Sequence, residues 1–528
     1  AAGERRRVVM AVAGTREAPV STRGGGYAGF VVQTMEKLIQ NNSARWGGDP
    51  KGTLALTVSN PMTRSYLSLG EAKGDTFQTY WFPSQPMEME PSNLDMDLWP
   101  VLEMLSARTG DARWGEMASA MAAAFARDGF DPRSGLGYLG TENNFDVVQR
   151  GPRSRMGHGI PHFKPKNDGN CLTLPLDLLW SHAPAQMARM FRSMFYGLVT
   201  DGASMDYNRF CRYNYDDRDR KPSMERSTGH CAFDTAGGRM IHWWASCWAR
   251  TGDAECLAWA QRMADKWQAV QHPESGLIPN FFGGVEGKAG DPMPPGKWCE
   301  SRGAAQTASA WLDAVGELRK RPGGEKLAAQ LTDMATRLAR GVARHTYDAQ
   351  ERVFREHRSL DGTPWLATGR YTFPTQEAKD AAVKKDPKLA RAAVWDGGGF
   401  YRHGGYWQVC AGTSIPYWLA QAAARTRDAE LLDRVRRMAA DAMDEARKVK
   451  GEFTEEGLWT FHASAQYIKT FLLLSQATGD PVYRQWAREL ADREIRLLSA
   501  IECPDWWRLP ERAALLEALL ELDEATRQ

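Results

Sequence analysis

Apolar residues recur at helical spacing along most of the chain, and four of these stretches end in the same short polar segment. Its core is Ala-Arg-Thr-Gly-Asp or a close variant. The four copies span Leu105–Asp111, Cys247–Asp253, Ala423–Asp428 and Ser475–Asp480. Gly accepts the left-handed conformation that ends a helix, and the Asp that follows can cap the next helix. The pattern therefore predicts αα-hairpins, in which consecutive helices lie antiparallel.

A second kind of turn follows the second helix of a hairpin. It reads DPRSGL over Asp131–Leu136, HPESGL over His272–Leu277 and, more loosely, EGLW over Glu456–Trp459. Pro prevents continuation of a helix and Gly supplies a positive φ, so these segments are predicted to be turns. A longer connection, rich in Gly and aromatic residues, comes after each of them.

Helix, tight turn, helix and longer loop, repeated along the chain, predict an all-α fold of the (α/α) toroid type. In such a ring each hairpin buries its apolar face against its neighbours. Seven hairpins are favoured and six are the alternative, while a long helical solenoid is the competing arrangement. We expect the toroid because the loops, and not the helix faces, carry the unusual residues. Residues 1–90 are predicted to be an irregular N-terminal extension packed on the toroid, and residues 91–528 the toroid itself.

Composition narrows the function classes. The 528 residues are 43% hydrophobic and 25% charged with a formal net charge of +2, so no global field attracts nucleic acid. No stretch approaches the ~20 apolar residues of a membrane span. Eight Cys show no paired spacing, which argues against a zinc or disulfide framework. The chain begins at Ala1 without Met, and we expect a bacterial periplasmic or secreted protein.

The order of several local motifs between residues 92 and 495 resembles polysaccharide lyase family 2, the (α/α)7-toroid pectate lyases. The matching segments are SGLGYLGTE ending at Glu142, LPLDLLW over Leu174–Trp180, MDYNR over Met205–Arg209, HTYD over His345–Asp348 and GYW ending at Trp407.

The resemblance implies a role for Arg209 as the Brønsted base and a divalent metal held by histidines and a glutamate. Here the residue after Arg209 is Phe210, which cannot bind metal. The other two ligand positions fall on Glu142 and near Asp168, whose oxygens suit a hard cation such as calcium, with manganese as an alternative. We therefore expect no cofactor, and keep a divalent cation at Glu142 and Asp168 as the alternative.

Arginines interleaved with aromatic residues follow the MDYNR motif. A uronate lyase removes the proton α to the sugar carboxylate, which requires a base and positive groups that stabilise the resulting charge. Arg209 and Arg212, with Tyr213, suit binding of the carboxylate, because guanidinium binds carboxylates in bidentate fashion. Guanidinium is normally protonated, so neutral Tyr or His residues are the more ordinary bases. The further candidates for the base are Tyr207, Tyr213, His230 and His403, whereas His242 is expected to be a hydrogen-bonded core histidine.

A second cluster joins five glycines to several aromatic rings over Trp395–Trp407. Such a run cannot form a regular helix, and a loop that brings rings and a cation close to a ligand is its natural use. Comparable loops carry further cations and rings. The predicted substrate-binding residues of these loops are Lys297, Trp298, Arg370, Trp395, Tyr401, Arg402 and Trp407.

These residues predict a carbon–oxygen lyase that cleaves a uronic-acid polysaccharide by β-elimination, with an acidic polysaccharide or oligosaccharide as its partner. Two alternatives stay open. An inverting glycoside hydrolase on the same fold would need two carboxylates, and candidates for these are Asp95, Asp97, Glu142, Asp146 and Asp396. A non-catalytic protein that binds acidic polysaccharide is the other.

Overall fold

The computed structural model describes most of the helical part of the chain. The residues described are 26–42, 89–91, 98–132, 134–137, 143–146, 151–154, 174–207, 232–282, 296, 298–363, 381, 384, 400–402, 414–448, 461–500 and 509–527. No helix among them is sufficiently long and apolar to cross a membrane.

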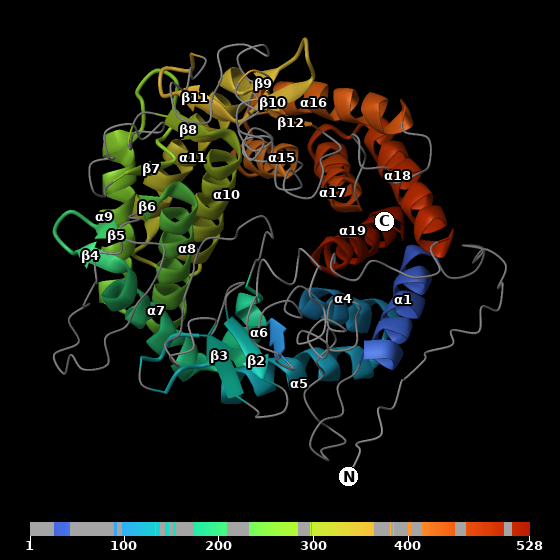
Figure 1. The fold of residues 1–528 in the computed structure, drawn as a ribbon, viewed down its shortest axis with the longest axis horizontal. Coiled ribbons are helices and arrows are strands. Elements are labelled where there is room, and N and C mark those ends of the chain that lie inside the picture. The colour runs from blue at the N-terminus through green and yellow to red at the C-terminus, as the bar shows by residue number, and fades with distance from the viewer. Residues whose placement is uncertain are drawn as a thin grey trace.

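The helices follow one another around a ring (Figure 1). Within the described residues they form seven pairs, and this confirms the predicted all-α toroid. The pairs are α4 (Trp99–Thr109) with α5 (Ala112–Asp128), α6 (Leu176–His182) with α7 (Pro184–Leu198), α8 (Asp234–Thr251) with α9 (Ala254–Val270), α10 (Ser301–Leu318) with α11 (Glu325–His345), α15 (Ile415–Thr426) with α16 (Ala429–Lys448), α17 (Phe461–Thr478) with α18 (Pro481–Ala500), and α19 (Leu509–Arg527) with α1 (Gly26–Asn42).

The first helices of successive pairs form the inner wall. Helices α8, α10, α15, α17 and α19 each contact the next one, and α19 contacts α4. Nearly every residue of α8 and α10 is buried, whereas α9 and α11 alternate buried and exposed positions. A helix that is apolar on all sides requires neighbours on all sides, so α8 and α10 lie inside and their partners outside.

The repeated tight turns are helix caps. Gly110, Gly252 and Gly479 adopt φ values of 72°, 78° and 71°. In the third copy Arg427 takes the same conformation with φ 54°. The Asp that follows then accepts a hydrogen bond from the start of the next helix, as when the Asp253 carboxylate accepts from Glu255 N at 3.0 Å. Both predicted roles, the left-handed end and the Asp cap, are confirmed in all four copies.

The predicted turns at Asp131–Leu136 and His272–Leu277 are also confirmed. Asp131 N donates to Leu136 O at 2.8 Å, and His272 N donates to Leu277 O at 2.9 Å. Gly135 and Gly276 have φ values of 79° and 74°. The Glu456–Trp459 turn lies outside the described residues.

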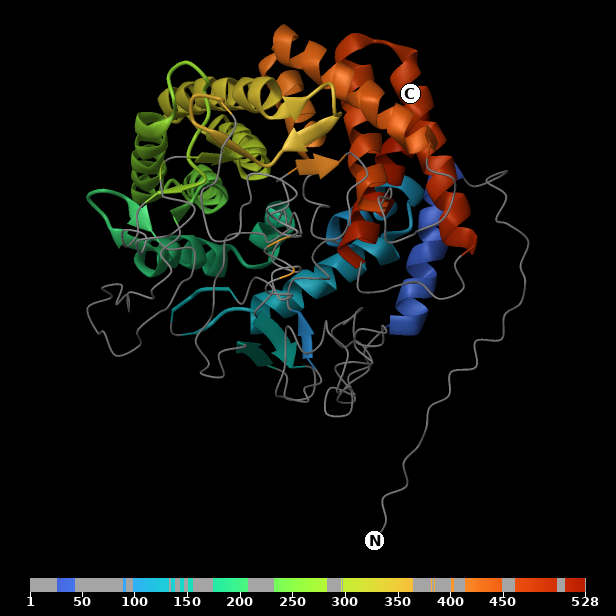
Figure 2. The ribbon, with the colours of Figure 1, turned by 45° about the horizontal axis from the view of Figure 1, so that its top comes forward.

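Short strands occupy the connections that lead from an outer helix to the next inner helix. They are β4 (Val199–Asp201), β5 (Asp206–Tyr207), β6 (Ala232–Phe233), β7 (Phe281–Phe282), β8 (Trp298–Glu300), β9 (Tyr347–Asp348), β10 (Val353–Arg355), β11 (His357–Ser359) and β12 (Phe400–Arg402), together with β1 (Met89–Pro91), β2 (Asn143–Asp146) and β3 (Gly151–Ser154). They pair antiparallel: β6 with β7, β8 with β11, and β10 with both β9 and β12. The strands are the arrows of Figure 2. The β6–β7 sheet leads into α8 and the β8–β11 sheet into α10, so these sheets fix where both helices begin.

The two ends of the described chain close the ring. Helix α1 packs against α19 and α4. The Asp523 carboxylate on α19 accepts a hydrogen bond from Ala28 N at 3.3 Å, so it lies at the N-terminus of α1. The prediction that residues 1–90 are irregular was therefore wrong for Gly26–Asn42. The packing of apolar residues such as Val31 and Met35 against α19 and α4 explains the helix.

We expect substitution of the turn glycines to separate backbone strain from steric crowding. An L-residue in the left-handed conformation costs roughly 1–2 kcal/mol. Nothing lies within 4 Å of a Cβ added at Gly110, whereas at Gly276 it would lie 2.3 Å from the backbone oxygen of Arg337. Gly110→Ala should therefore lower the free energy of unfolding by roughly 1–2 kcal/mol, and Gly276→Ala by more, because the backbone at Arg337 cannot move aside as a side chain can. Denaturant titration of both variants measures this, and equal losses would contradict it.

We expect Asp523→Ala to weaken ring closure. The variant removes the acceptor at the first turn of α1 and an ion pair with Arg527, in which Nε lies 2.9 Å from Oδ2. The expected loss in unfolding free energy is about 1–2 kcal/mol. Hydrogen exchange should show that protection is lost first in α1; protection lost evenly around the ring would contradict this.

Candidate functional site

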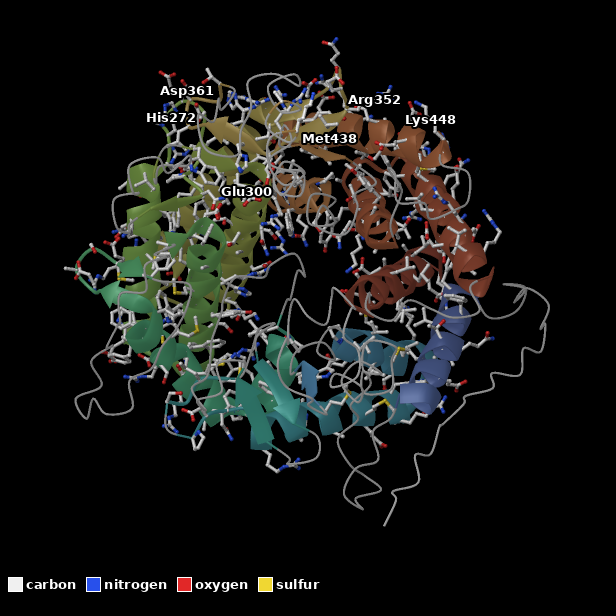
Figure 3. All side chains as sticks on the ribbon, viewed as in Figure 1. His272, Glu300, Arg352, Asp361, Met438 and Lys448 are labelled. Carbon is white, nitrogen blue, oxygen red and sulfur yellow. The ribbon has the colours of Figure 1, made fainter. Side chains whose placement is uncertain are left out.

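Two carboxylates stand at the beginnings of adjacent inner helices. Asp234 is the first residue of α8. Glu300, labelled in Figure 3, ends β8 directly before α10. Their side chains are almost fully buried, with exposed fractions of 1% and 5%. We call Asp234 and Glu300 the acidic pair.

A glycine holds the two carboxylates close together. A Cβ added at Gly303, on the first turn of α10, would lie 2.8 Å from Asp234 Oδ2 and 3.1 Å from Glu300 Oε2. Two atoms that close to one point are separated by no more than about 6 Å. The missing side chain at Gly303 therefore allows the acidic pair to share one space.

Asn280 connects the two carboxylates. Its backbone oxygen accepts from Asp234 N at 2.7 Å, and its side-chain Nδ2 donates to Glu300 Oε2 at 3.1 Å. Arg302 Nε donates to the other oxygen of Glu300 at 2.8 Å. Asn280 is 2% exposed, and its Oδ1 atom has no hydrogen-bond partner among the described residues. An unsatisfied acceptor therefore lies beside two carboxylates.

The surroundings of the acidic pair are buried and partly aromatic. Burial, with the negative charges of Asp234 and Glu300, raises the pKa of the Cys299 thiol well above its ordinary value. The Trp298 ring packs edge-on against the His357 ring at 4.7 Å between centroids. Carboxylates in such surroundings, with their hydrogen-bond partners fixed, suit proton transfer and the stabilisation of positive charge.

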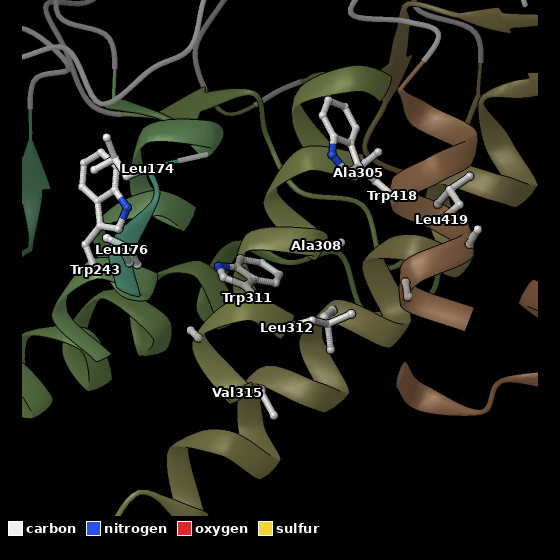
Figure 4. Close-up of a cluster of buried hydrophobic side chains, with 14 of the residues drawn as sticks. Leu174, Leu176, Trp243, Ala305, Ala308, Trp311, Leu312, Val315, Trp418 and Leu419 are labelled. Atoms are coloured by element: carbon white, nitrogen blue, oxygen red, sulfur yellow. The ribbon is translucent and has the colours of Figure 1, made fainter. Parts of the chain in front are cut away.

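A pocket of about 700 Å³ opens on the inner wall at the other end of α10. Its apolar lining includes Leu312 and Val315 on α10 and, across from them, Leu174 and Leu176 at the start of α6 (Figure 4). Its polar lining comes from α10 and the two residues after it, and from five other helices, α4, α6, α8, α11 and α15. The polar and charged lining residues are Glu103, Asp177, His242, Asp313, Glu317, Arg319, Lys320, Thr332 and Arg425. We call this space the inner-wall pocket.

The titratable groups of the inner-wall pocket are strongly shifted. Burial lowers the pKa of His242 to about 4, although the nearby Asp313 opposes the shift. Burial alone would raise the pKa of Asp313, but His242, Arg425 and Arg239 outweigh it and hold this pKa below its usual value. Burial, with the charge of Asp177, raises the pKa of Glu103. His242 is therefore neutral at pH 7 and Asp313 is negative.

His242 differs from its prediction in one respect. It was expected to be a hydrogen-bonded core histidine, and it is indeed 6% exposed. Its Nδ1 atom, however, has no hydrogen-bond partner in the part of the chain that the structure describes.

Two of the predicted site residues are buried. Tyr207 is 3% exposed and its hydroxyl donates to Phe233 O at 2.5 Å. Burial, and then the charge of Asp234, raise the pKa of the Tyr207 phenol well above its ordinary value. This geometry argues against Tyr207 as a base that meets substrate, because its hydroxyl is already bound inside the protein. Trp298 is 5% exposed, so its ring is packed between neighbours and does not form an open platform for a sugar.

The side chains of the remaining predicted residues lie outside the part of the chain that the structure describes. Tyr401 and Arg402 lie in β12, opposite Phe354 and Val353 of β10, and only their backbone is described. Outside the described side chains lie Arg209, Arg212, Tyr213, His230, Lys297, Arg370, Trp395, His403 and Trp407, the predicted cation ligands Glu142 and Asp168, and the predicted hydrolase carboxylates Asp95, Asp97, Asp146 and Asp396. Their roles stay predictions.

Three cysteines of the described residues, Cys247, Cys256 and Cys299, are buried and free. Sulfur atoms of Cys247 and Cys256 and a carboxylate oxygen of Asp253 lie within 4.8 Å of one another. Both Asp253 oxygens already have partners, since one caps Glu255 N and the other binds Arg192 Nη1 at 2.8 Å. The group therefore serves the α8–α9 turn.

Comparison with known proteins gives distant structural likenesses. No family model and no curated protein matches the chain, so membership of polysaccharide lyase family 2 is not supported. A cellobiose 2-epimerase from Bacillus thermoamylovorans aligns at 10% identity and TM-score 0.42 over 70% of this chain and 79% of that one. A sugar epimerase from a ruminal bacterium aligns at 11% identity and TM-score 0.43 over 76% and 89%.

An unsaturated glucuronyl hydrolase from a Bacillus species aligns at 14% identity and TM-score 0.38, over 69% of this chain and 90% of that one. At such scores these proteins assign no residue of this chain a role.

We expect His242 to make stability depend on pH. Unfolded histidine binds a proton near pH ~6.5, but the folded His242 has a pKa of about 4. Between these values the unfolded state binds more protons, so this contribution to stability is lost as the pH falls from about 6.5 to about 4. From pH 7 to pH 4.5 the loss should be about 2 kcal/mol smaller in His242→Gln than in the parent.

Denaturant titrations at both pH values measure this difference. His182→Gln, at an exposed position at the end of α6, is the control and should behave like the parent. Equal pH dependence of His242→Gln and the parent would contradict the assignment.

Proposed function

We propose that this chain is a carbohydrate-processing enzyme that cleaves a glycosidic bond by acid–base catalysis at the acidic pair. The observation that carries the proposal is the convergence of Asp234 and Glu300 on the space beside Gly303. Glycoside hydrolysis generally requires two carboxylates on opposite sides of the bond that breaks.

The spacing favours one of the two hydrolytic mechanisms. The carboxyl groups are ~5–5.5 Å apart in retaining enzymes and ~6.5–9.5 Å apart in inverting ones. The upper limit of about 6 Å between the nearest oxygens of the acidic pair supports the retaining mechanism. This differs from the inverting hydrolase considered from the sequence.

The environments of the two carboxylates suggest their roles. Glu300 receives hydrogen bonds from Arg302 and Asn280, which stabilise a negative charge, so it suits the nucleophile that attacks the anomeric carbon. Asp234 is then the group that gives a proton to the departing oxygen and later accepts one from water. The unsatisfied Oδ1 of Asn280 is suited to accept a hydrogen bond from a substrate hydroxyl.

A second candidate is the β-elimination reaction on a uronic-acid polysaccharide. It is supported by the sequence between Arg209 and Tyr215, where two arginines alternate with aromatic residues. The two reactions give different products. Hydrolysis produces new reducing ends alone, whereas elimination also produces a conjugated double bond with ultraviolet absorbance.

We expect Asp234→Asn and Glu300→Gln each to reduce kcat at least 100-fold, because each removes a group that takes part in bond cleavage. The substrates are pectate, alginate, glucuronan, ulvan and a neutral β-glucan, assayed for reducing ends and for ultraviolet absorbance. Glu325→Gln is the matched control, since Glu325 is also the first residue of a helix, α11, but is exposed. It should leave kcat unchanged.

Stability must be measured on the same samples. If the acidic pair serves only packing, activity will fall in proportion to the fraction of folded protein. Loss of activity without loss of folded protein supports the proposal. Unchanged kcat in both variants, or the absence of new reducing ends with every polysaccharide, would refute it.

A further inference from the structure

The inner-wall pocket is separate from the acidic pair. A helix rises ~1.5 Å per residue, so Asp313 lies roughly 20 Å along α10 from Glu300. The pocket is lined by the second half of α10, the end of α15 at Arg425 and the beginning of α6. Its volume of about 700 Å³ lies within the ~300–1,000 Å³ of pockets that bind small molecules.

Several charged groups on the pocket wall are already in ion pairs. Arg425 Nη1 lies 2.7 Å from Asp313 Oδ1, and Arg239 Nη1 lies 3.7 Å from Asp313 Oδ2. Lys320 Nζ lies 2.7 Å from Glu317 Oε1. The wall carries four acidic residues (Glu103, Asp177, Asp313 and Glu317) and three basic ones (Arg319, Lys320 and Arg425), so neither sign of charge strongly dominates it.

Two buried polar atoms on the pocket wall nevertheless have no hydrogen-bond partner among the described residues. Glu317 is 8% exposed and its Oε2 atom has no hydrogen-bond partner among the described residues. His242 Nδ1 also has no hydrogen-bond partner among the described residues, and both residues line the pocket. Buried polar atoms without partners are rare in proteins and costly, which points to a partner that binds from the pocket.

We propose that the inner-wall pocket binds a neutral saccharide, held by Glu317, His242 and Arg425. A sugar hydroxyl both donates and accepts, so it can donate to the free oxygen of Glu317 and either donate to or accept from the neutral imidazole of His242. The remaining N–H groups of Arg425 donate to ring or hydroxyl oxygens. Leu312 and Val315 on one side and Leu174 on the other contact the apolar faces of the sugar ring.

A charged ligand fits this pocket less well. An anion that bound Arg425 or Lys320 would have to displace Asp313 or Glu317 from its ion pair. A cation that bound Asp313 or Glu317 would likewise have to displace Arg425 or Lys320. A neutral polyol leaves both pairs intact. This selectivity follows from the two ion pairs, and is independent of the reaction at the acidic pair.

The experiment is calorimetric titration of the full chain with cellobiose, glucuronic acid and glucosamine. We expect cellobiose to bind more tightly than the two charged sugars. Glu317→Gln, which removes the charge from the free acceptor, should weaken cellobiose binding roughly tenfold.

A glycine of the pocket offers a second variant that should fold well. Gly316 lies in α10 and lines the pocket, and nothing lies within 4 Å of a Cβ added there. Gly316→Leu should fill the pocket and weaken binding at least tenfold without loss of stability, because Leu favours a helix more than Gly does. Gly29→Leu is the matched control, since Gly29 lies in α1 and also has open space around its Cβ position. It should leave binding unchanged.

Asp234→Asn distinguishes the two sites, because it should retain cellobiose binding at the inner-wall pocket even if it abolishes turnover. Binding that is lost in Asp234→Asn but unaffected by Gly316→Leu would place the saccharide at the acidic pair and overturn the proposal. Absence of binding by cellobiose, or tighter binding of either charged sugar, would overturn it as well.

Discussion

The ring depends on the contact between the two ends of the described chain. Helix α19 has α17 on one side and α1 and α4 on the other, and its Asp523 reaches the first turn of α1. The other six pairs are joined by short turns, so their partners are held together covalently. The seventh pair has no such link and rests on side-chain packing and on polar contacts such as the hydrogen bond from Ala28 N to Asp523. The ion pair between Arg108 of α4 and Glu524 of α19, at 2.5 Å, holds α19 to the following pair.

The same inner helix carries both proposed sites. The start of α10 holds the acidic pair through Glu300 and Gly303, and its last two turns form one wall of the inner-wall pocket. Since α10 is buried along nearly its whole length, it cannot shift without disturbing α8, α11 and α15. Its burial therefore gives both groups of side chains a rigid support, which acid–base chemistry and selective binding both require.

Local chemistry was predictable from the sequence where neighbours in the chain decide the structure. The Gly and Asp of the hairpin turns act on residues two or three positions away, and even Arg427 follows the pattern although it is not glycine. The acidic pair was not predictable in this way. Asp234 and Glu300 are far apart in the chain, and only the packing of α8 against α10 brings them together. A signal existed, since each acidic residue directly precedes a run rich in Gly and Ala, whose small side chains allow close packing around it.

Residues outside the hairpins were harder to predict for a related reason. Helix α1 lies in a region rich in Gly and Pro, and its partners are at the opposite end of the sequence. Tyr207 stands next to arginines in the sequence, which suggested a site, but its hydroxyl points to the carbonyl of Phe233. Neighbours in the sequence suggested a role for Tyr207, and the hydrogen bond that its hydroxyl already makes argues against that role.

The contact between α1 and α19 also has a consequence for synthesis of the protein on the ribosome. Helix α1 emerges before the other described helices, and α19, which covers much of its apolar face, emerges after them. That face therefore stays partly uncovered while the hairpins between α4 and α18 are made. During that interval the nascent chain is an open arc. It exposes apolar surface at two ends, one at α1 and α4 and one at the newest inner helix. A chaperone that shields such edges, or a second nascent arc that joins them, would then determine how much of the product becomes a closed ring.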